Sequence, residues 1–300
     1  MKNLLFFINP NAGQGDIREC LMDVAQEFAA AGYRITLHPT QGPGDLTDVI
    51  AREGANYDII VSTGGDGTLN ETTAGLMALP EDKRPVIGYI PGGTVNDVAT
   101  TLGLSKVPRK AAKEITTGSP YAIDVGSLGD RWFNYVAAFG VFTDVSYRTP
   151  QEEKRLLGRL AYLLDGTKSL ADIHPIDVEI TVNGETRQER VMLGLVTSTT
   201  SVGGFSVKGV SDVRLNDGLF EVLLVREIRT AKALSNVVAA LLKRDFSGEE
   251  FFFTKASRVE FRFPEATGWT VDGEFGGSLT HAVIENHPRA VSILVPPKNT

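Results

Sequence analysis

The sequence predicts two domains: an α/β N-terminal domain with a mostly parallel sheet, and a C-terminal antiparallel β-sandwich-like domain. Apolar runs alternate with segments of helical periodicity over residues 1–120, which is typical of a parallel sheet with helices on its faces. From about Tyr121 the apolar runs become short and alternate with polar residues, as antiparallel strands do. We expect residues 1–122 to form the first domain and residues 123–287 the second. The chain can then come back to the first domain with residues 288–300.

The composition is that of an ordinary globular protein, and it argues against several functional classes. The 300 residues carry a net charge of −7, whereas a nucleic-acid-binding protein needs a basic face. The single cysteine, Cys20, cannot form a disulfide within the chain. The run Leu4–Ile8 is too short for a signal sequence, and no apolar run reaches the roughly 18 residues that span a membrane. We expect a cytoplasmic protein without a nucleic-acid partner, and a homodimer stays open.

The N-terminal elements follow from apolar spacing and chain breakers. Continuous apolar runs predict strands that are covered on both faces, and residues 17–28 show helical spacing until Gly32 ends the helix. The expected order is strand 4–8, helix 17–28, strand 34–37, a short helix from about Asp45, strand 59–62 and strand 86–90.

The C-terminal part is expected to contain short strands with two helical insertions. Asn183-Gly184 predicts a hairpin, because both residue types tolerate the positive φ angles of a two-residue turn. The final apolar run, 290–296, can rejoin the first domain. Strands are expected at 132–141, 177–182, 191–199, 219–225 and 257–263, and helices at about 152–170 and 230–243.

A glycine-rich turn, Gly64 to Thr68, follows the apolar run 59–61 and precedes a segment of helical character. Glycines let the backbone bend tightly and approach a ligand, and a helix N-terminus offers N–H groups to phosphate. A carboxylate beside bound phosphate needs a cation between them, so Asp66 indicates Mg²⁺. The other interpretation is an ordinary strand–helix turn with a capping aspartate.

Two more polar turns are expected at the same edge of the sheet. Asn9–Gly13 follows the first strand and Gly92–Asp97 the fourth, and turns after parallel strands share the carboxyl edge where ligands bind. Neither a Gly-Lys-Ser/Thr phosphate loop nor a complete dinucleotide fingerprint is present. The three turns therefore predict a phosphate site of another kind.

Four further acids are candidates for chemistry. Asp97 can join a metal-bound water network or cap a helix, and Asp124 lies inside an apolar run, where a carboxylate without a partner would be costly. Asp272 and Glu274 lie two positions apart, so in a strand they would share one face, where one of them could accept a proton. The other interpretation of this segment is a hairpin turn with solvated acids.

Taken together, these motifs resemble the nucleotide-binding motifs of the diacylglycerol kinase catalytic-domain family. The match rests on Asn9–Gly13, Gly64–Glu71, Gly92–Asp97 and the late Asp272-Gly273-Glu274, and it covers nearly the whole chain. The family includes soluble bacterial diacylglycerol kinases and the related sphingosine and ceramide kinases. The resemblance implies a fold like that of NAD kinases and diacylglycerol kinases. It also implies transfer of the γ-phosphoryl group of ATP to a lipid hydroxyl, diacylglycerol giving phosphatidic acid being the first expectation.

The resemblance further implies roles for individual residues. Glu274 is the implied proton acceptor, with Asp272 next and Asp97 in the water network. The residues implied for ATP binding are Asn9, Pro10, Asn11, Ala12, Gly13, Thr40, Gly64, Gly65, Asp66, Gly67, Thr68, Leu69, Asn70, Glu71 and Thr94.

Two Mg²⁺ sites are implied. Asp66 would hold the catalytic ion, partly through water, and the burial of Asp124 favours either a place in the same metal-bound water network or a hydrogen-bonding role. A second, structural ion would be bound by the side chain of Asp217 and the carbonyls of Arg214 and Leu219. The same segment also suits a plain Asn-Asp-Gly turn between two strands.

Two other functions stay open at this point. A NAD kinase or another small-molecule kinase shares the Gly-Gly-Asp-Gly turn, and a regulator that binds nucleotide or lipid without catalysis would keep the same fold. A kinase with a lipid substrate must contact the membrane surface transiently, and the acidic net charge shows no evident means of doing so.

Overall fold

The computed structural model describes residues 1–9, 16–94, 96–140, 174–198, 201–202, 205–206, 215–243 and 245–297. The chain divides into two compact units, Met1–Val125 with Pro288–Thr300, and Gly126–His287. Among the described residues, no helix is long and apolar enough to cross a membrane.

The first unit alternates strands and helices. Its elements are β1 (Lys2–Ile8), α1 (Asp16–Ala30), β2 (Tyr33–Pro39), α2 (Asp45–Glu53), the 3₁₀ turn η1 (Gly54–Asn56), β3 (Ile59–Gly64), α3 (Asp66–Met77), the 3₁₀ turn η2 (Glu81–Lys83), β4 (Val86–Pro91), α4 (Asp97–Leu102), α5 (Pro108–Thr117) and the first part of β5 (Ser119–Leu128).

Strands β1 to β4 of this unit pair in parallel. β1 lies between β2 and β3, and β3 pairs with β4. The end of β15 (Glu274–Val295) adds a further parallel strand, since Ile293 pairs with Ile87 of β4. The predicted strands 4–8, 34–37, 59–62 and 86–90 all lie within these elements. Because the strands run in one direction, the turns that follow β1, β3 and β4 emerge at one edge.

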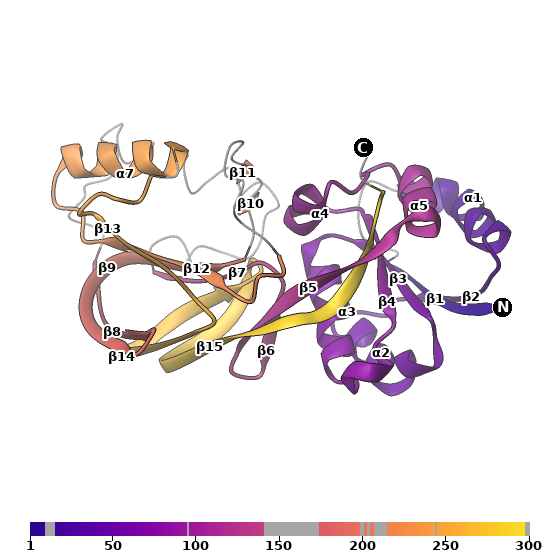
Figure 1. Ribbon diagram of the computed structural model, residues 1–300, viewed down its shortest axis with the longest axis horizontal. Coiled ribbons are helices and arrows are strands. Elements are labelled where there is room, and N and C mark those ends of the chain that lie inside the picture. The colour runs from indigo at the N-terminus through magenta and orange to yellow at the C-terminus, as the bar shows by residue number, and fades with distance from the viewer. Residues whose placement is uncertain are drawn as a thin grey trace. The chain divides into compact units, whose positions relative to one another are not determined.

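Helices cover both faces of these strands (Figure 1). α1 packs with α5, and α2 packs with α3. Side chains of β1 alternate between the two layers, so that Leu4 and Phe6 join the core formed with α1 and α5. Covered on both faces, the residues of β1 from Leu4 to Ile8 are buried. This burial explains why the strand is continuously apolar in sequence.

The second unit is made chiefly of antiparallel strands. Its elements are the remainder of β5, β6 (Arg131–Phe133), β7 (Val136–Gly140), β8 (Ile176–Val182), β9 (Glu185–Thr197), β10 (Ser201–Val202), β11 (Phe205–Ser206), β12 (Phe220–Arg226), α7 (Ala231–Lys243), β13 (Phe251–Ala256), β14 (Arg258–Val271) and the first part of β15.

The order of neighbouring strands in this unit is β13, β12, β9, β7 and β14, and β14 pairs with β15. The Asn183-Gly184 hairpin is confirmed, because β8 and β9 pair directly across it at Val182 and Glu185. Both turn residues have positive φ, 52° and 79°. The helix expected at 230–243 is α7, whereas the helix expected at 152–170 lies outside the described residues.

An aromatic cluster fills the core of the second unit. The rings of Phe139 and Trp269 lie 4.7 Å apart between centroids, and Phe261 and Phe263 pack against both. A smaller apolar cluster joins α7 to the other face of β12 and β13.

Candidate nucleotide and catalytic site

The turn after β3 leads directly into a helix. β3 ends at Gly64, Gly65 is the N-cap, and α3 begins at Asp66. The N–H of Leu69 donates to the Gly65 carbonyl (3.2 Å), so the N–H groups of the first turn remain for other acceptors. A Cβ at Gly64 would lie 2.1 Å from the hydroxyl oxygen of Thr68, so only glycine fits there. This geometry favours an anion at the helix start.

The turn after β4 packs against the first turn, backbone against backbone. The N–H of Gly92 donates to the carbonyl of Gly64 (2.7 Å). A Cβ at Gly93 would lie 2.5 Å from the Cα of Gly65. The two glycine turns predicted to share an edge therefore touch, and their glycines are needed for that close approach.

Two buried side chains hold this pair of turns. Asn96 has φ 58°, accepts the Gly93 N–H on Oδ1 (3.1 Å) and donates to the Gly93 carbonyl from Nδ2 (2.7 Å). The Tyr89 hydroxyl donates to the Gly64 carbonyl (2.9 Å) and lies 3.2 Å from Asn96 Oδ1. Burial, and then the charge of Asp66, hold the pKa of Tyr89 well above its usual range, so the hydroxyl stays a donor.

Sequence reasoning gave no role to Tyr89 or Asn96. Asparagine is one of the few residues that adopt positive φ readily, so its place at the end of a glycine turn was a usable signal. A tyrosine in an apolar strand has no such signal, because it looks like a core residue.

The first polar turn is described only in part. Asn9 follows β1 directly, and Pro10, Asn11, Ala12 and Gly13 lie outside the described residues. Thr40 lies beside the same strand end, since its N–H donates to the carbonyl of Ile8 (2.9 Å). The structure thus places the predicted Thr40 at the carboxyl edge of the parallel strands.

The remaining predicted nucleotide residues differ in exposure. Thr94 is exposed on the second turn, and Asn70 and Glu71 are half-buried on α3. Leu69 is fully buried in the core, so only its backbone is able to face a ligand.

Two predicted acids of the first unit are buried. Asp97 is the first residue of α4 and Asn96 occupies the cap position, so the interpretation of Asp97 as the helix cap is wrong. Asp124 lies in β5, where its Oδ1 accepts the N–H of Arg289 (2.8 Å). That hydrogen bond compensates for part of the cost of burying the Asp124 carboxylate.

Asp272 and Glu274 do not share a strand face, so that expectation is wrong. β14 ends at Val271 and β15 begins at Glu274, and these two residues pair directly. Asp272 (φ 48°) and Gly273 (φ 84°) form the two-residue turn between them. The physical reason is that an Asp-Gly pair favours a tight turn with two positive φ angles over a continuing strand.

The turn gives the two acids different surroundings. Glu274 is exposed, whereas Asp272 is buried. The interpretation as a hairpin turn is therefore correct for the backbone, but the acids are not both solvated. The Asp272 carboxylate accepts three backbone N–H groups, those of Asn134 (2.7 Å), Tyr135 (3.0 Å) and Val136 (3.1 Å).

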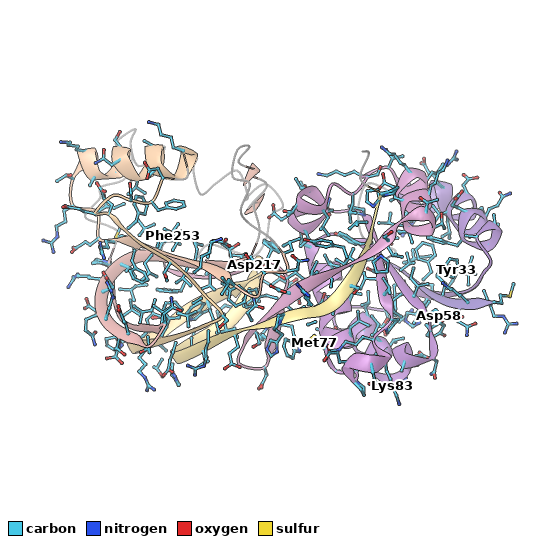
Figure 2. The ribbon with its side chains drawn as sticks, in the orientation of Figure 1. Tyr33, Asp58, Met77, Lys83, Asp217 and Phe253 are labelled. Carbon is cyan, nitrogen blue, oxygen red and sulfur yellow. The ribbon has the colours of Figure 1, made fainter. Side chains whose placement is uncertain are left out.

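The candidate site for a second metal ion is a turn before β12. Asp217, labelled in Figure 2, is exposed, and its Oδ1 accepts the N–H of Leu219 (3.1 Å). Arg214 lies outside the described residues. In the part of the chain that the structure describes, no group of three or more His, Cys, Asp or Glu side chains converges on one point.

Comparison with known proteins identifies the family. Residues 3–128 match the diacylglycerol kinase catalytic domain, and residues 136–295 match the YegS C-terminal NAD kinase beta sandwich-like domain. A diacylglycerol kinase of Bacillus subtilis (strain 168) is 37% identical over an alignment of 302 positions, which covers 99% of this chain and 97% of that protein. The chain belongs to the diacylglycerol kinase family.

Further relatives of the diacylglycerol kinase family agree over nearly the full length. A diacylglycerol kinase of Staphylococcus carnosus (strain TM300) is 34% identical, covering 93% of this chain and 90% of its own. A crystal structure of a diacylglycerol kinase from Bacillus anthracis str. Sterne superposes with a TM-score of 0.79 at 28% identity, covering 100% of this chain and 98% of that one. The expected pairing of a catalytic domain with a C-terminal β-sandwich-like domain is confirmed.

The two matched regions of this diacylglycerol kinase family member divide the candidate residues between them. The catalytic-domain match contains both glycine turns together with Asp97 and Asp124. The second match contains Asp217, Asp272 and Glu274. As a family member with this catalytic domain, the chain is an ATP-dependent lipid kinase.

Proposed function

We propose that this lipid kinase transfers the γ-phosphoryl group of ATP to the free hydroxyl of diacylglycerol, giving phosphatidic acid and ADP. The hydroxyl oxygen forms the new bond to the γ-phosphorus, the bond to the β–γ bridging oxygen breaks, and a protein carboxylate takes the hydroxyl proton. The relatives that match over nearly the whole chain are named diacylglycerol kinases, which supports the acceptor. The contact between the two glycine turns is the structural observation that carries the proposal.

The first unit would bind the triphosphate. The N–H groups at the start of α3 would donate to phosphate oxygens, and the glycines leave room for the phosphates to approach the backbone. Asp66 and Asp124 offer the oxygen ligands that Mg²⁺ prefers, with phosphates and waters completing the shell. When bound, that ion would neutralise charge on the transferred group. Asp97, buried at the start of α4, would orient water near these acids.

The second unit would supply the proton acceptor. Glu274 is exposed at the first position of β15, so a substrate hydroxyl has access to its carboxylate. Asp272 would act as a positioning residue, because its carboxylate holds the chain between β6 and β7 against the turn that carries Glu274. A structural Mg²⁺ at Asp217, with the carbonyls of Arg214 and Leu219, stays a prediction.

Three features of the proposal concern the protein in the cell. Contact with the membrane surface would be transient, as a water-exposed enzyme with a lipid substrate requires. A cytoplasmic location and a homodimer stay predictions. Sedimentation of the purified protein, alone and with lipid vesicles, tests the homodimer and the membrane contact together.

The acceptor is tested by transfer of labelled phosphate from ATP to a panel of lipid alcohols in mixed micelles. We expect label in diacylglycerol, dependent on Mg²⁺, and none in NAD or fructose 6-phosphate. Transfer to NAD or the sugar phosphate alone would show a small-molecule kinase. Nucleotide binding without transfer to any acceptor would show a non-catalytic regulator.

A further inference from the structure

The carbonyl of Gly64 is the point where the two glycine turns meet. It accepts the N–H of Gly92 at 2.7 Å and the hydroxyl of Tyr89 at 2.9 Å. Both lone pairs of this oxygen are therefore used, one by the neighbouring turn and one by a side chain of β4. The same hydroxyl lies 3.2 Å from Oδ1 of Asn96, at the far end of the second turn.

We propose that Tyr89 is a positioning residue that fixes the spacing of the two glycine turns and thereby sets the affinity for the triphosphate of ATP. The inference rests on the proposed function of this site and adds to it a residue outside the glycine motifs. Tyr89 pairs with Ser62 in the strand register, so its side chain reaches two positions further along β3 to Gly64. One hydroxyl thus connects the end of β3 with the residue that closes the second turn.

A purely structural role for the Tyr89 ring would require only its apolar part. The side chain is 1% exposed, and a phenylalanine would fill the same space. The hydroxyl, however, is directed at polar atoms of both turns instead of apolar neighbours. A buried hydroxyl without partners would be costly, so the contacts determine where the turns sit relative to β4.

The turns tolerate little movement. Because a Cβ at Gly93 would lie 2.5 Å from the Cα of Gly65, the two backbones are already in contact. The N–H groups that would hold phosphate belong to the helix that starts at the next residue, Asp66. A shift of the second turn away from Gly64 would therefore move apart the N–H groups that must bind one phosphate group together.

The test compares Tyr89→Phe with Tyr33→Phe. Tyr33, labelled in Figure 2, begins β2 at the opposite end of the strands and provides a matched control for loss of a hydroxyl. With ATP varied at saturating lipid, we expect Tyr89→Phe to raise the KM for ATP about tenfold. A change of this size corresponds to the loss of the free energy of one hydrogen bond. The kcat and the KM for lipid should stay within about twofold of wild type, because the lost interaction serves ground state and transition state alike. Tyr33→Phe should match the wild type.

Hydrogen–deuterium exchange of the protein without ligand gives a readout that does not depend on activity. Tyr89→Phe should speed exchange in peptides covering 64–71 and 89–97 and leave other peptides unchanged. Faster exchange in a protein that phosphorylates no lipid would support the positioning role while overturning the proposed function. Unchanged exchange, or a lowered Tm with an unchanged KM for ATP, would overturn the positioning role.

Discussion

Asp272 and Glu274 are two positions apart, yet their carboxylates have different surroundings. Asp272 is 5% exposed and accepts three backbone N–H groups, whereas Glu274 is exposed at the start of β15. A carboxylate that is hydrogen-bonded in its charged form is a poor proton acceptor. The two acids of a single turn therefore differ in how accessible their carboxylates are to a substrate hydroxyl.

Paired substitutions should separate the two roles. Glu274→Gln should lower kcat by about 100-fold or more, because the proton acceptor is lost, and should leave Tm unchanged. Asp272→Asn should cost about 3 kcal/mol of unfolding free energy, because one amide oxygen cannot replace a carboxylate at three donors. Urea unfolding and steady-state kinetics measure both effects. A kcat near wild type for Glu274→Gln would remove it from the mechanism.

Glu221 of β12 gives a prediction about pH. Burial raises the pKa of Glu221 above its usual 4.5, and Lys255, 3.3 Å away, offsets part of this. As pH rises from 4.5, the unfolded chain releases this proton before the folded protein does, so stability falls until the folded pKa is passed. Glu221→Gln should remove that loss. Compared with the wild type, the variant should therefore gain more unfolding free energy at pH 7.5 than at pH 4.5.

The exposed Glu265 provides the control for Glu221. Glu265→Gln should change the unfolding free energy little and equally at both pH values. A Glu221→Gln protein that is less stable at pH 7.5 than the wild type would show that the ion pair with Lys255 outweighs the burial cost.

At the scale of elements, the site depends on two turns whose backbones touch. The hydrogen bond from Gly92 to Gly64 and the contact of Gly93 with Gly65 leave no room for a side chain between them. The parallel pairing of β3 with β4 brings both turns to the same edge. The strand pairing therefore sets the distance between the two turns that are proposed to bind phosphate.

Gly93→Ala tests this close approach, with Gly42→Ala as control. A Cβ at Gly93 would meet the Cα of Gly65 at 2.5 Å, while a Cβ at Gly42 meets nothing within 4 Å. We expect Gly93→Ala to lose at least about tenfold in kcat/KM for ATP, because the second turn must move. Gly42→Ala should behave as wild type, and equal activity of the two variants would contradict the packed-turn geometry.

The sequence predicts features that are encoded by neighbouring residues, and it does not predict contacts between residues far apart in the chain. The turns after β3 and β4 were foreseen because glycine clusters and apolar runs are local signals. The Asp272-Gly273 turn carries the same kind of local signal, and a hairpin turn was one of the two interpretations that the sequence left open. The hydrogen bond from Arg289 to Asp124 joins residues 165 positions apart, and no local pattern encodes such a contact.

At the scale of the whole molecule, the net charge of −7 affects how readily the enzyme approaches a lipid surface. Anionic lipid surfaces repel an acidic protein, and salt screens that repulsion over distances of about 10 Å. We expect turnover of diacylglycerol in vesicles rich in anionic lipid to rise with ionic strength between about 0.02 and 0.2 M.

Vesicles of neutral lipid provide the control, and turnover on them should change little with salt. A rate on anionic vesicles that falls as salt is added would contradict this expectation. It would show that a local basic surface, and not the net charge, governs the encounter.

Strand β15 belongs to both units: Glu274–His287 lies in the second, and the residues from Pro288 onward complete the first. Ile293 enters the parallel set beside β4, and the carbonyl of Ala290 accepts Nη1 of Arg84 (2.8 Å). During synthesis, the ribosome delivers this last strand only after the entire second unit has emerged. The first unit must therefore wait, with β4 uncovered on one side, until the second unit has been translated.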